Sequence, residues 1–174
     1  MRNHLPFREK TELFLITEAG NILAEDHGTY LMFPGGGIDG HETERQSSAI
    51  RELQEETHMT VNGVLTPLCT VSWIWFPEWA NNAKRQERYA EFQGERVHMF
   101  CGSAQPVQGI GHISEDTWKN TEGLSPEECL EKLIRYAQQD HSNTYAYRIA
   151  QQAAIRTACA LAGRPLHTDT VDTR

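Results

Sequence analysis

The 174-residue chain lacks several features that mark specialised classes of protein. It has no apolar run long enough to span a bilayer, no internal repeat and no secretory signal at its start. Its four cysteines lie about thirty residues apart without a Cys-x-x-Cys pair, and its eight histidines show no zinc-ligand spacing. We therefore expect neither a membrane protein nor a disulfide scaffold, but a cytoplasmic protein with reduced thiols.

Positive charge is also scarce. The chain has 16 Lys and Arg residues against 24 Asp and Glu residues, and its net charge of −8 argues against a nucleic-acid surface. The net negative charge does not exclude a negatively charged ligand, because a bound cation makes the electrostatic potential around it positive. With 39% apolar residues the chain can build one core, so we expect one domain over residues 1–164 and a mobile polar tail over 165–174.

One segment concentrates the charged side chains. Residues 35–59 read GGGIDGHETERQSSAIRELQEETHM, a glycine-rich turn followed by a helix that we expect over 48–58. At about 100° per residue, Glu52, Glu55 and Glu56 share one face of that helix. Like charges one turn apart, close to the negative end of the helix dipole, each cost about 0.3–1 kcal/mol. Converging carboxylates instead suit a hard divalent cation such as Mg²⁺, which prefers oxygen ligands.

The segment resembles the signature of the Nudix hydrolases, a family that cleaves nucleoside diphosphates linked to another moiety. The family pattern is Gly, five residues, Glu, seven residues, then Arg-Glu-aliphatic-any-Glu-Glu-any-Gly-aliphatic. Gly36 and Glu42 match the first spacing, and the run from Arg51 to Glu56 matches the core. This chain departs twice from the pattern, with eight residues between Glu42 and Arg51 and with His58 in place of glycine.

The surplus residue has two alternative positions. It can lie in a loop around residues 44–46, where it disturbs no helical phase. Alternatively, Thr43 and Gln46 form a capping box, the helix starts at Glu44, and the surplus residue makes a π-bulge. The position of the helix end is not decided by the sequence at His58, because histidine adopts the left-handed conformation of a helix cap less easily than glycine does.

The resemblance implies roles for the residues of the signature. Glu52 and Glu56 are expected to hold Mg²⁺, or Mn²⁺ in its place, with Glu55 in a direct or water-bridged role and the backbone carbonyl of Gly35 or Gly36 completing the shell. Glu52 and Glu55 thereby count as catalytic. Arg51 is expected to orient a neighbouring carboxylate. Glu42 is the weaker orienting candidate, since counting back from Arg51 reaches Thr43 instead.

Two further candidates lie outside the signature. Family members often draw a general base from a loop after the long central strands, where this chain has Glu115, Asp116 and Glu122, and we choose Glu115. Arg85 and Arg88 interleave with aromatic residues and are candidates for binding the substrate's phosphates, although an exposed polar loop explains them equally well.

A competing motif is excluded by its context. Gly35-x-Gly37-x-x-Gly40 satisfies the dinucleotide-binding fingerprint and follows a strand-like run over 29–33. That fingerprint also needs a helix that opens at the glycines and a second buried strand that ends in an acidic residue. Residues 41–46 are polar throughout, and the acidic residues lie inside the expected helix. A phosphate-binding Gly-x-x-x-x-Gly-Lys-Ser/Thr segment is absent as well.

The order of elements predicts an α/β (α+β) fold with a mixed β-sheet sandwiched between helices, which is similar to the Nudix fold. Residues 12–17 and 22–24 are expected to form a hairpin, and strands within 63–77 and over 95–101 to pair across the polar stretch 78–94. Two helices are expected after them, one beginning at Ser125 and Pro126 and one over 144–162.

We therefore predict a Nudix-type pyrophosphohydrolase that is metal-dependent and cleaves a phosphoanhydride bond in a nucleoside diphosphate linked to another moiety. The alternative is a catalytically inactive Nudix-like domain that binds or senses a nucleotide. The expected partner is a small nucleotide, without nucleic acid or membrane, and a homodimer is left open. No substrate is named, because the chain has no clear subgroup marker beyond Pro77 and no coenzyme A pattern.

Overall fold

The computed structural model describes residues 2–38, 44–107, 118, 121–139 and 144–166. In chain order its elements are β1 (Phe7–Ile16), β2 (Glu25–Asp26), β3 (Leu31–Met32), α1 (Arg45–Thr57), β4 (Met59–Ile74), a 3₁₀ turn (Pro77–Trp79), α2 (Ala83–Glu91), β5 (Gly94–Pro106), α3 (Pro126–Gln139) and α4 (Tyr145–Leu161).

The main sheet has the strand order β1-β5-β4. The central strand β5 runs parallel to β1 and antiparallel to β4, so the sheet is mixed. Residues 34–38, the glycine strap, run along the outer edge of β1. The strap is held by hydrogen bonds from Leu13 N–H to the Pro34 carbonyl (2.8 Å), from Thr11 N–H to the Gly36 carbonyl (2.9 Å) and from Ile38 N–H to the Glu9 carbonyl (3.1 Å).

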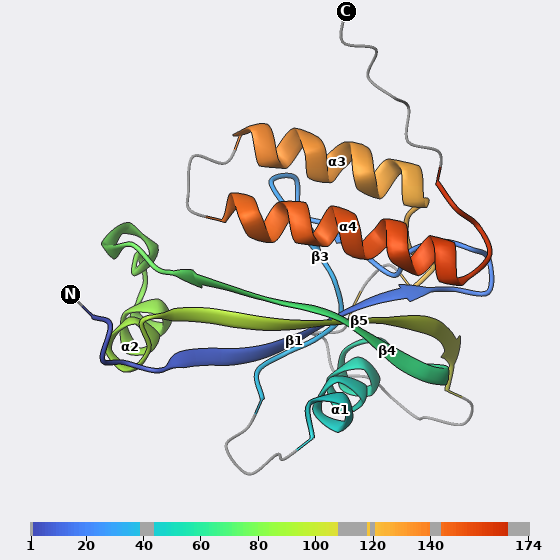
Figure 1. The fold of residues 1–174 in the computed structure, drawn as a ribbon. Helices are drawn as coiled ribbons and strands as arrows, with labels where there is room; N and C mark the ends of the chain where they lie inside the picture. The colour runs from blue at the N-terminus through green and yellow to red at the C-terminus, as the bar shows by residue number, and fades with distance from the viewer. Residues whose placement is uncertain (1, 39–43, 108–117, 119–120, 140–143, 167–174) are drawn as a thin grey trace, which may run out of the picture.

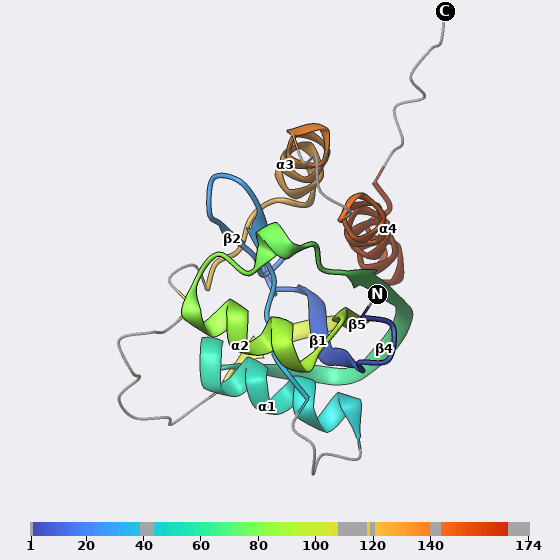
Figure 2. The ribbon, with the colours of Figure 1, turned by 90° about the vertical axis from the view of Figure 1, so that its left-hand side faces the viewer.

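Helices cover both faces of the sheet. α1 lies on one face, and α3 and α4 lie together on the other (Figures 1 and 2). β1 serves both interfaces, because Leu13 and Leu15 pack toward Leu53 of α1 while Phe14 and Ile16 pack in the core beneath α3 and α4. A strand that is buried on both faces has an uninterrupted run of apolar residues in its sequence, as β1 does from Leu13 to Ile16. The expected mixed sheet between helical layers is confirmed.

Most of the expected elements are present with shifted boundaries. The antiparallel pairing of β4 and β5 is confirmed, and Ser125 caps α3 by accepting a hydrogen bond from Glu128 N–H (3.2 Å). α4 agrees with the expected helix to within one residue at each end. The turn of the first hairpin is also present, with Gly20 at φ 86°, but the expected partner strand is reduced to one bridge between Ile16 and Ile22.

Two expectations differ from the structure. The strand expected over 29–33 is only two residues long, and the stretch between β4 and β5 contains α2 in place of an exposed polar loop. α2 is started by Asn82, whose side chain accepts a hydrogen bond from Arg85 N–H (3.0 Å). No residue of α2 is buried, and its nine residues are mostly charged or polar, so few apolar residues indicate a helix there. Within the described ranges, no helix is long and apolar enough to cross a membrane.

Candidate functional site

α1 carries the acidic residues and begins later than the capping-box alternative requires. Glu44 is the N-cap in an extended conformation without a side-chain cap bond, and the helix is α-helical from Arg45 to Thr57. The π-bulge alternative is therefore wrong. The expected loop around residues 44–46 is only partly right, because Arg45 and Gln46 already lie in the helix, and the regular helix keeps the acidic residues in phase.

The other end of α1 is closed by His58. This residue adopts the left-handed conformation, with φ 55° and ψ 21°, and its N–H donates to the Gln54 carbonyl (3.3 Å). Among the described residues it is the only one other than glycine with a positive φ. Histidine thus takes the conformation that glycine supplies in the family pattern, and α1 ends at the expected position.

α1 faces the sheet with its apolar side and the glycine strap with its acidic side. Leu53 is fully buried, whereas Glu52 and Glu56 point to the strap. The Glu56 carboxylate accepts a hydrogen bond from Gly35 N–H (3.3 Å). The Glu52 carboxylate lies against Gly36, where a Cβ would fall 2.2 Å from its Oε2. Gly35 has φ 142°, and a Cβ there would fall 2.2 Å from the Thr11 carbonyl oxygen.

The electrostatics of this face are unfavourable without a counter-charge. Burial raises the pKa of Glu56 to about 7; the hydrogen bond from Gly35 opposes the rise, and the neighbouring charges of Glu52 and Glu55 add to it. Arg51 offsets part of the repulsion by pairing with Glu52 (2.8 Å) and with Glu55 (2.9 Å).

The donor set fits a hard divalent cation in its chemistry. In the part of the chain that the structure describes, no three His, Cys, Asp or Glu side chains are gathered closely enough to hold a metal ion as they stand. Two carboxylates held against one backbone strap nevertheless form an arrangement that a divalent cation stabilises. The carbonyls of Pro34 and Gly36 both accept hydrogen bonds from N–H groups of β1. The carbonyl of Gly35, between them in the strap, is therefore the candidate backbone ligand for a cation.

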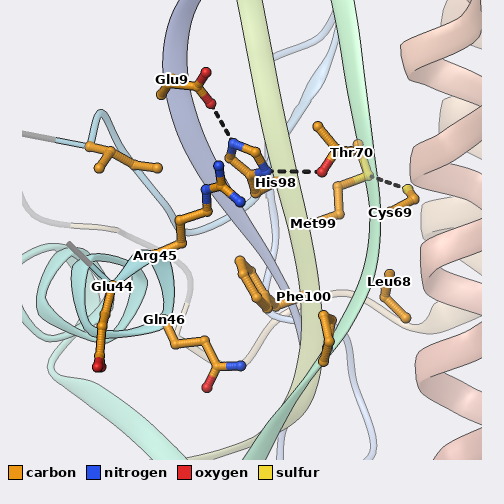
Figure 3. Close-up of a pocket in the computed structure, with 12 residues that line it drawn as sticks. Glu9, Glu44, Arg45, Gln46, Leu68, Cys69, Thr70, His98, Met99 and Phe100 are labelled. Atoms are coloured by element: carbon orange, nitrogen blue, oxygen red, sulfur yellow. Dashed lines mark hydrogen bonds and ion pairs between the residues drawn. The ribbon is translucent and has the colours of Figure 1, made fainter. Parts of the chain in front are cut away.

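A pocket of about 880 Å³ opens beside the first turn of α1 (Figure 3). Its floor is the sheet, where the ring nitrogens of His98 contact Glu9 on one side and the Thr70 hydroxyl (2.9 Å) on the other. His98 is only 5% exposed, as expected for a structural histidine. The pocket is lined by Glu9, Ile38, Glu44, Arg45, Gln46, Pro67, Leu68, Cys69, Thr70, His98, Met99 and Phe100.

The candidate general base lies outside the described residues. Glu115, Asp116 and the signature residue Glu42 all fall in the gaps, whereas Glu122 is described and exposed. Near the gap that contains Glu115, the N–H of the buried Trp118 donates to the Glu56 carbonyl (3.1 Å). The chain is therefore attached to α1 three residues after Glu115.

The candidate phosphate-binding arginines lie on α2, which Figure 1 places at the end of the sheet away from α1. The guanidinium of Arg85 lies 5.3 Å from the ring centroid of Trp79 and donates to the Asn81 side chain (3.1 Å). Burial and the charge of Arg8 lower the pKa of Arg88. Neither arginine lines the pocket beside α1.

Sequence reasoning missed the polar floor of the pocket. Glu9, Thr70 and His98 come from three different strands, and each is unremarkable in its own segment. The position of His98 between Val97 and Met99 on β5 is typical of a structural histidine and gives no indication of a pocket.

Comparison with known proteins agrees with this geometry. The NUDIX domain model matches residues 2–109. Among solved structures, an ADP compounds hydrolase is 19% identical with a TM-score of 0.53, covering 92% of this chain and 77% of its own. The Escherichia coli (E. coli) dihydroneopterin triphosphate pyrophosphohydrolase is 16% identical with a TM-score of 0.50, covering 87% and 96%. These likenesses show the shared fold. A search of curated proteins found no significant match.

Proposed function

This chain belongs to the Nudix family of hydrolases, and we propose that it cleaves the diphosphate bond of a nucleoside diphosphate linked to another moiety, using a divalent cation. The observation that carries the proposal is the contact of Glu52 and Glu56 with the glycine strap. Nudix hydrolases generally use divalent metal ions, and the α1 carboxylates provide the oxygen ligands that Mg²⁺ or Mn²⁺ prefers.

Each residue of the site has a proposed part. Glu52 and Glu56 hold the cation together with the Gly35 carbonyl, and Glu55, which is more exposed, acts directly or through a water. Arg51 positions Glu52 and Glu55 by bonding to both. When bound, the cation neutralises phosphate charge and lowers the pKa of a coordinated water.

The proposed general base is Glu115. The proposal is supported by Trp118, three residues after Glu115, whose N–H donates to the Glu56 carbonyl of the helix that carries the carboxylates. Arg85 and Arg88 are not proposed for the first contacts with substrate, since α2 lies at the far end of the sheet. Glu42 keeps its proposed orienting role from the signature alone.

The names of the similar structures agree with this proposal. One of them is described as acting on ADP compounds and the other as a pyrophosphohydrolase of a triphosphate. We propose the same bond class for this chain. The inactive alternative rests on the surplus residue and His58, and α1 is a regular helix from Arg45 to Thr57 in the presence of both.

A substrate panel tests the proposal. Nucleoside triphosphates, nucleotide sugars and dinucleotides are incubated with the full chain and Mg²⁺, and product is quantified by chromatography. At least one compound should be hydrolysed, and Glu56→Gln or Glu52→Gln should lower kcat/KM by about 10²–10³-fold because a metal ligand is lost. Glu131→Gln, on the exposed side of α3, is the matched control and should leave the rate unchanged.

Two outcomes contradict the proposal. If no compound turns over, or if Glu56→Gln leaves the rate unchanged, the assigned chemistry is wrong. Ligand-induced thermal stabilisation without product supports the binding or sensor alternative instead. The extent of the domain over 1–164, the cytoplasmic location and a homodimer stay predictions.

A further inference from the structure

We infer that the pocket beside α1 recognises a group with two adjacent hydrogen-bond donors, and that the carboxylate of Glu9 on β1 binds it. This inference rests on the proposed function for the phosphate-bearing half of the ligand. For the other half of the ligand, it specifies a pair of hydrogen-bond donors.

Among the described residues, the Glu9 carboxylate is held by two side chains of β5. Arg96 donates to its Oε1 (3.0 Å), and His98 Nε2 contacts its Oε2. Because an ionised carboxylate only accepts, Nε2 carries the hydrogen, and the Thr70 hydroxyl at 2.9 Å from Nδ1 supports the ring from its other side. Two fixed donors therefore lock the orientation of the Glu9 side chain.

The carboxylate keeps two acceptor positions for a ligand. A carboxylate has about four lone-pair positions, two on each oxygen. The bonds from Arg96 and His98 use one position on each oxygen, so one acceptor position remains on each. The side chain of Glu9 is 32% exposed and lines the pocket. An acceptor on each of two neighbouring oxygens suits a pair of adjacent donors, as in a bidentate contact.

The Glu9 carboxylate disfavours a phosphate on the floor of the pocket. Glu9, Glu44 and Arg45 all line the pocket, and the carboxylate of Glu9 itself repels phosphate oxygens unless a cation lies between them. The phosphates would instead lie at the α1 carboxylates, where the proposed divalent cation would be held. The uncharged part of the ligand then occupies the pocket, where Phe100 supplies apolar surface (Figure 3).

The glycine strap connects the two halves of the site. Gly35 contacts Glu56, and Ile38, which lines the pocket, donates its N–H to the Glu9 carbonyl (3.1 Å). Three residues of extended chain span at most about 10 Å. One nucleotide is long enough to place its phosphate at α1 and its uncharged part at Glu9.

Two parts of a nucleotide carry paired donors. The ring N–H and exocyclic amino group of guanine form one pair, and the two vicinal ribose hydroxyls form the other. Adenine presents a donor beside an acceptor on the corresponding edge, which leaves one Glu9 oxygen facing a lone pair. Both paired sources share the chemistry that Glu9 recognises, and measurement distinguishes them.

Equilibrium binding of nucleoside monophosphates to the full chain tests the inference by calorimetry. Monophosphates contain no phosphoanhydride bond, so they are not consumed. GMP is compared with IMP, which lacks the exocyclic amino group, and with 2′,3′-dideoxy-GMP, which lacks both hydroxyls. One of the two analogues should bind about tenfold more weakly than GMP, since a bond to a charged acceptor is lost. A weaker IMP identifies the base edge, and a weaker dideoxy compound identifies the ribose.

Variants assign the discrimination to Glu9. Glu9→Gln replaces one acceptor by a donor and should remove the difference between GMP and the weaker analogue. Glu95→Gln is the matched control, because Glu95 also lies on the sheet and pairs with an arginine, Arg8 (3.0 Å), but does not line the pocket. It should preserve the difference.

The inference is overturned if the three probes bind equally to the unmodified chain, if none of them binds, or if Glu9→Gln keeps the discrimination. The proposed function is judged separately. Mg²⁺-dependent hydrolysis without Glu9-dependent discrimination leaves the proposed function standing and removes this inference. Glu9-dependent discrimination without hydrolysis supports this inference and contradicts the proposed function.

Discussion

The carboxylate of Glu52 lies directly against Gly36, so that a Cβ on Gly36 would fall 2.2 Å from Glu52 Oε2. Gly36→Ala should therefore displace the carboxylate without opening the fold, because the atoms in the way belong to the end of a flexible side chain. We expect hydrolysis by the variant to fall by about 10²-fold, as for other misplaced catalytic groups, with a nearly unchanged free energy of unfolding. Kinetics and urea unfolding of the same sample measure both.

The neighbouring glycines serve as controls. Gly37→Ala meets only the end of the Arg8 side chain, at 3.0 Å, and should retain activity. Gly35→Ala meets the Thr11 carbonyl oxygen at 2.2 Å with φ at 142°, so it should destabilise the protein by at least about 2 kcal/mol. If Gly36→Ala is fully active, the position proposed for Glu52 is wrong.

His58 offers a stabilising substitution. Its φ of 55° is strained for a side chain with a Cβ, and glycine relieves that strain. After allowance for the greater freedom of glycine in the unfolded chain, we expect His58→Gly to raise the free energy of unfolding by about 0.5–1 kcal/mol. Urea denaturation measures the change.

His58→Ala separates the backbone from the imidazole. Alanine keeps the Cβ and the strain, so this variant should show no gain. Equal stabilisation by both substitutions would mean that removal of the imidazole, and not relief of the backbone, is responsible.

Glu12 is predicted to make stability fall as the pH rises. It is 7% exposed beneath α4, and burial raises the pKa of its carboxyl, while hydrogen bonds from Tyr147 (2.7 Å) and Gln151 (3.0 Å) and the charges of Lys10 and Arg148 oppose the rise. Since the folded pKa lies above the unfolded value, the folded state loses stability as the pH rises from the unfolded pKa through the folded one.

Glu12→Gln removes this ionisation. The variant's stability relative to the unmodified chain should increase as the pH is raised from about 4 to 8, reaching on the order of 1 kcal/mol. Thermal unfolding across that range measures it. Glu18→Gln, exposed in the same hairpin, is the matched control. A difference that does not change with pH contradicts the prediction.

Asp26 has the opposite effect at low pH. Burial alone would raise its pKa, but hydrogen bonds from Lys132 (2.7 Å), Tyr136 (2.6 Å) and Gly28 (2.9 Å) outweigh burial and lower it to about 2. The stability it contributes is present above the unfolded pKa and is lost as the pH falls through about 2. Asp26→Asn should cost about 1 kcal/mol at neutral pH and flatten the acid limb of the stability profile. Glu131→Gln on α3 should leave that limb unchanged.

Much of the fold was predictable because it depends on local patterns. The apolar run of β1, the cap at Ser125 and the length of α4 each follow from neighbouring residues. α2 was missed because it buries none of its residues. α1 contains the expected helix over 48–58 except for its last residue, and its first turn, over 45–47, is present only in the capping-box alternative, which starts the helix at Glu44.

The sequence by itself determined that Glu52, Glu55 and Glu56 share a face of one helix, because helical geometry repeats every 3.6 residues and needs no distant partner. Only the tertiary structure decided what that face meets. The strap reaches α1 because it pairs with β1, and Glu9 meets His98 across 89 residues of chain. Such contacts depend on the register of strands that are far apart in the sequence, and local patterns do not encode that register.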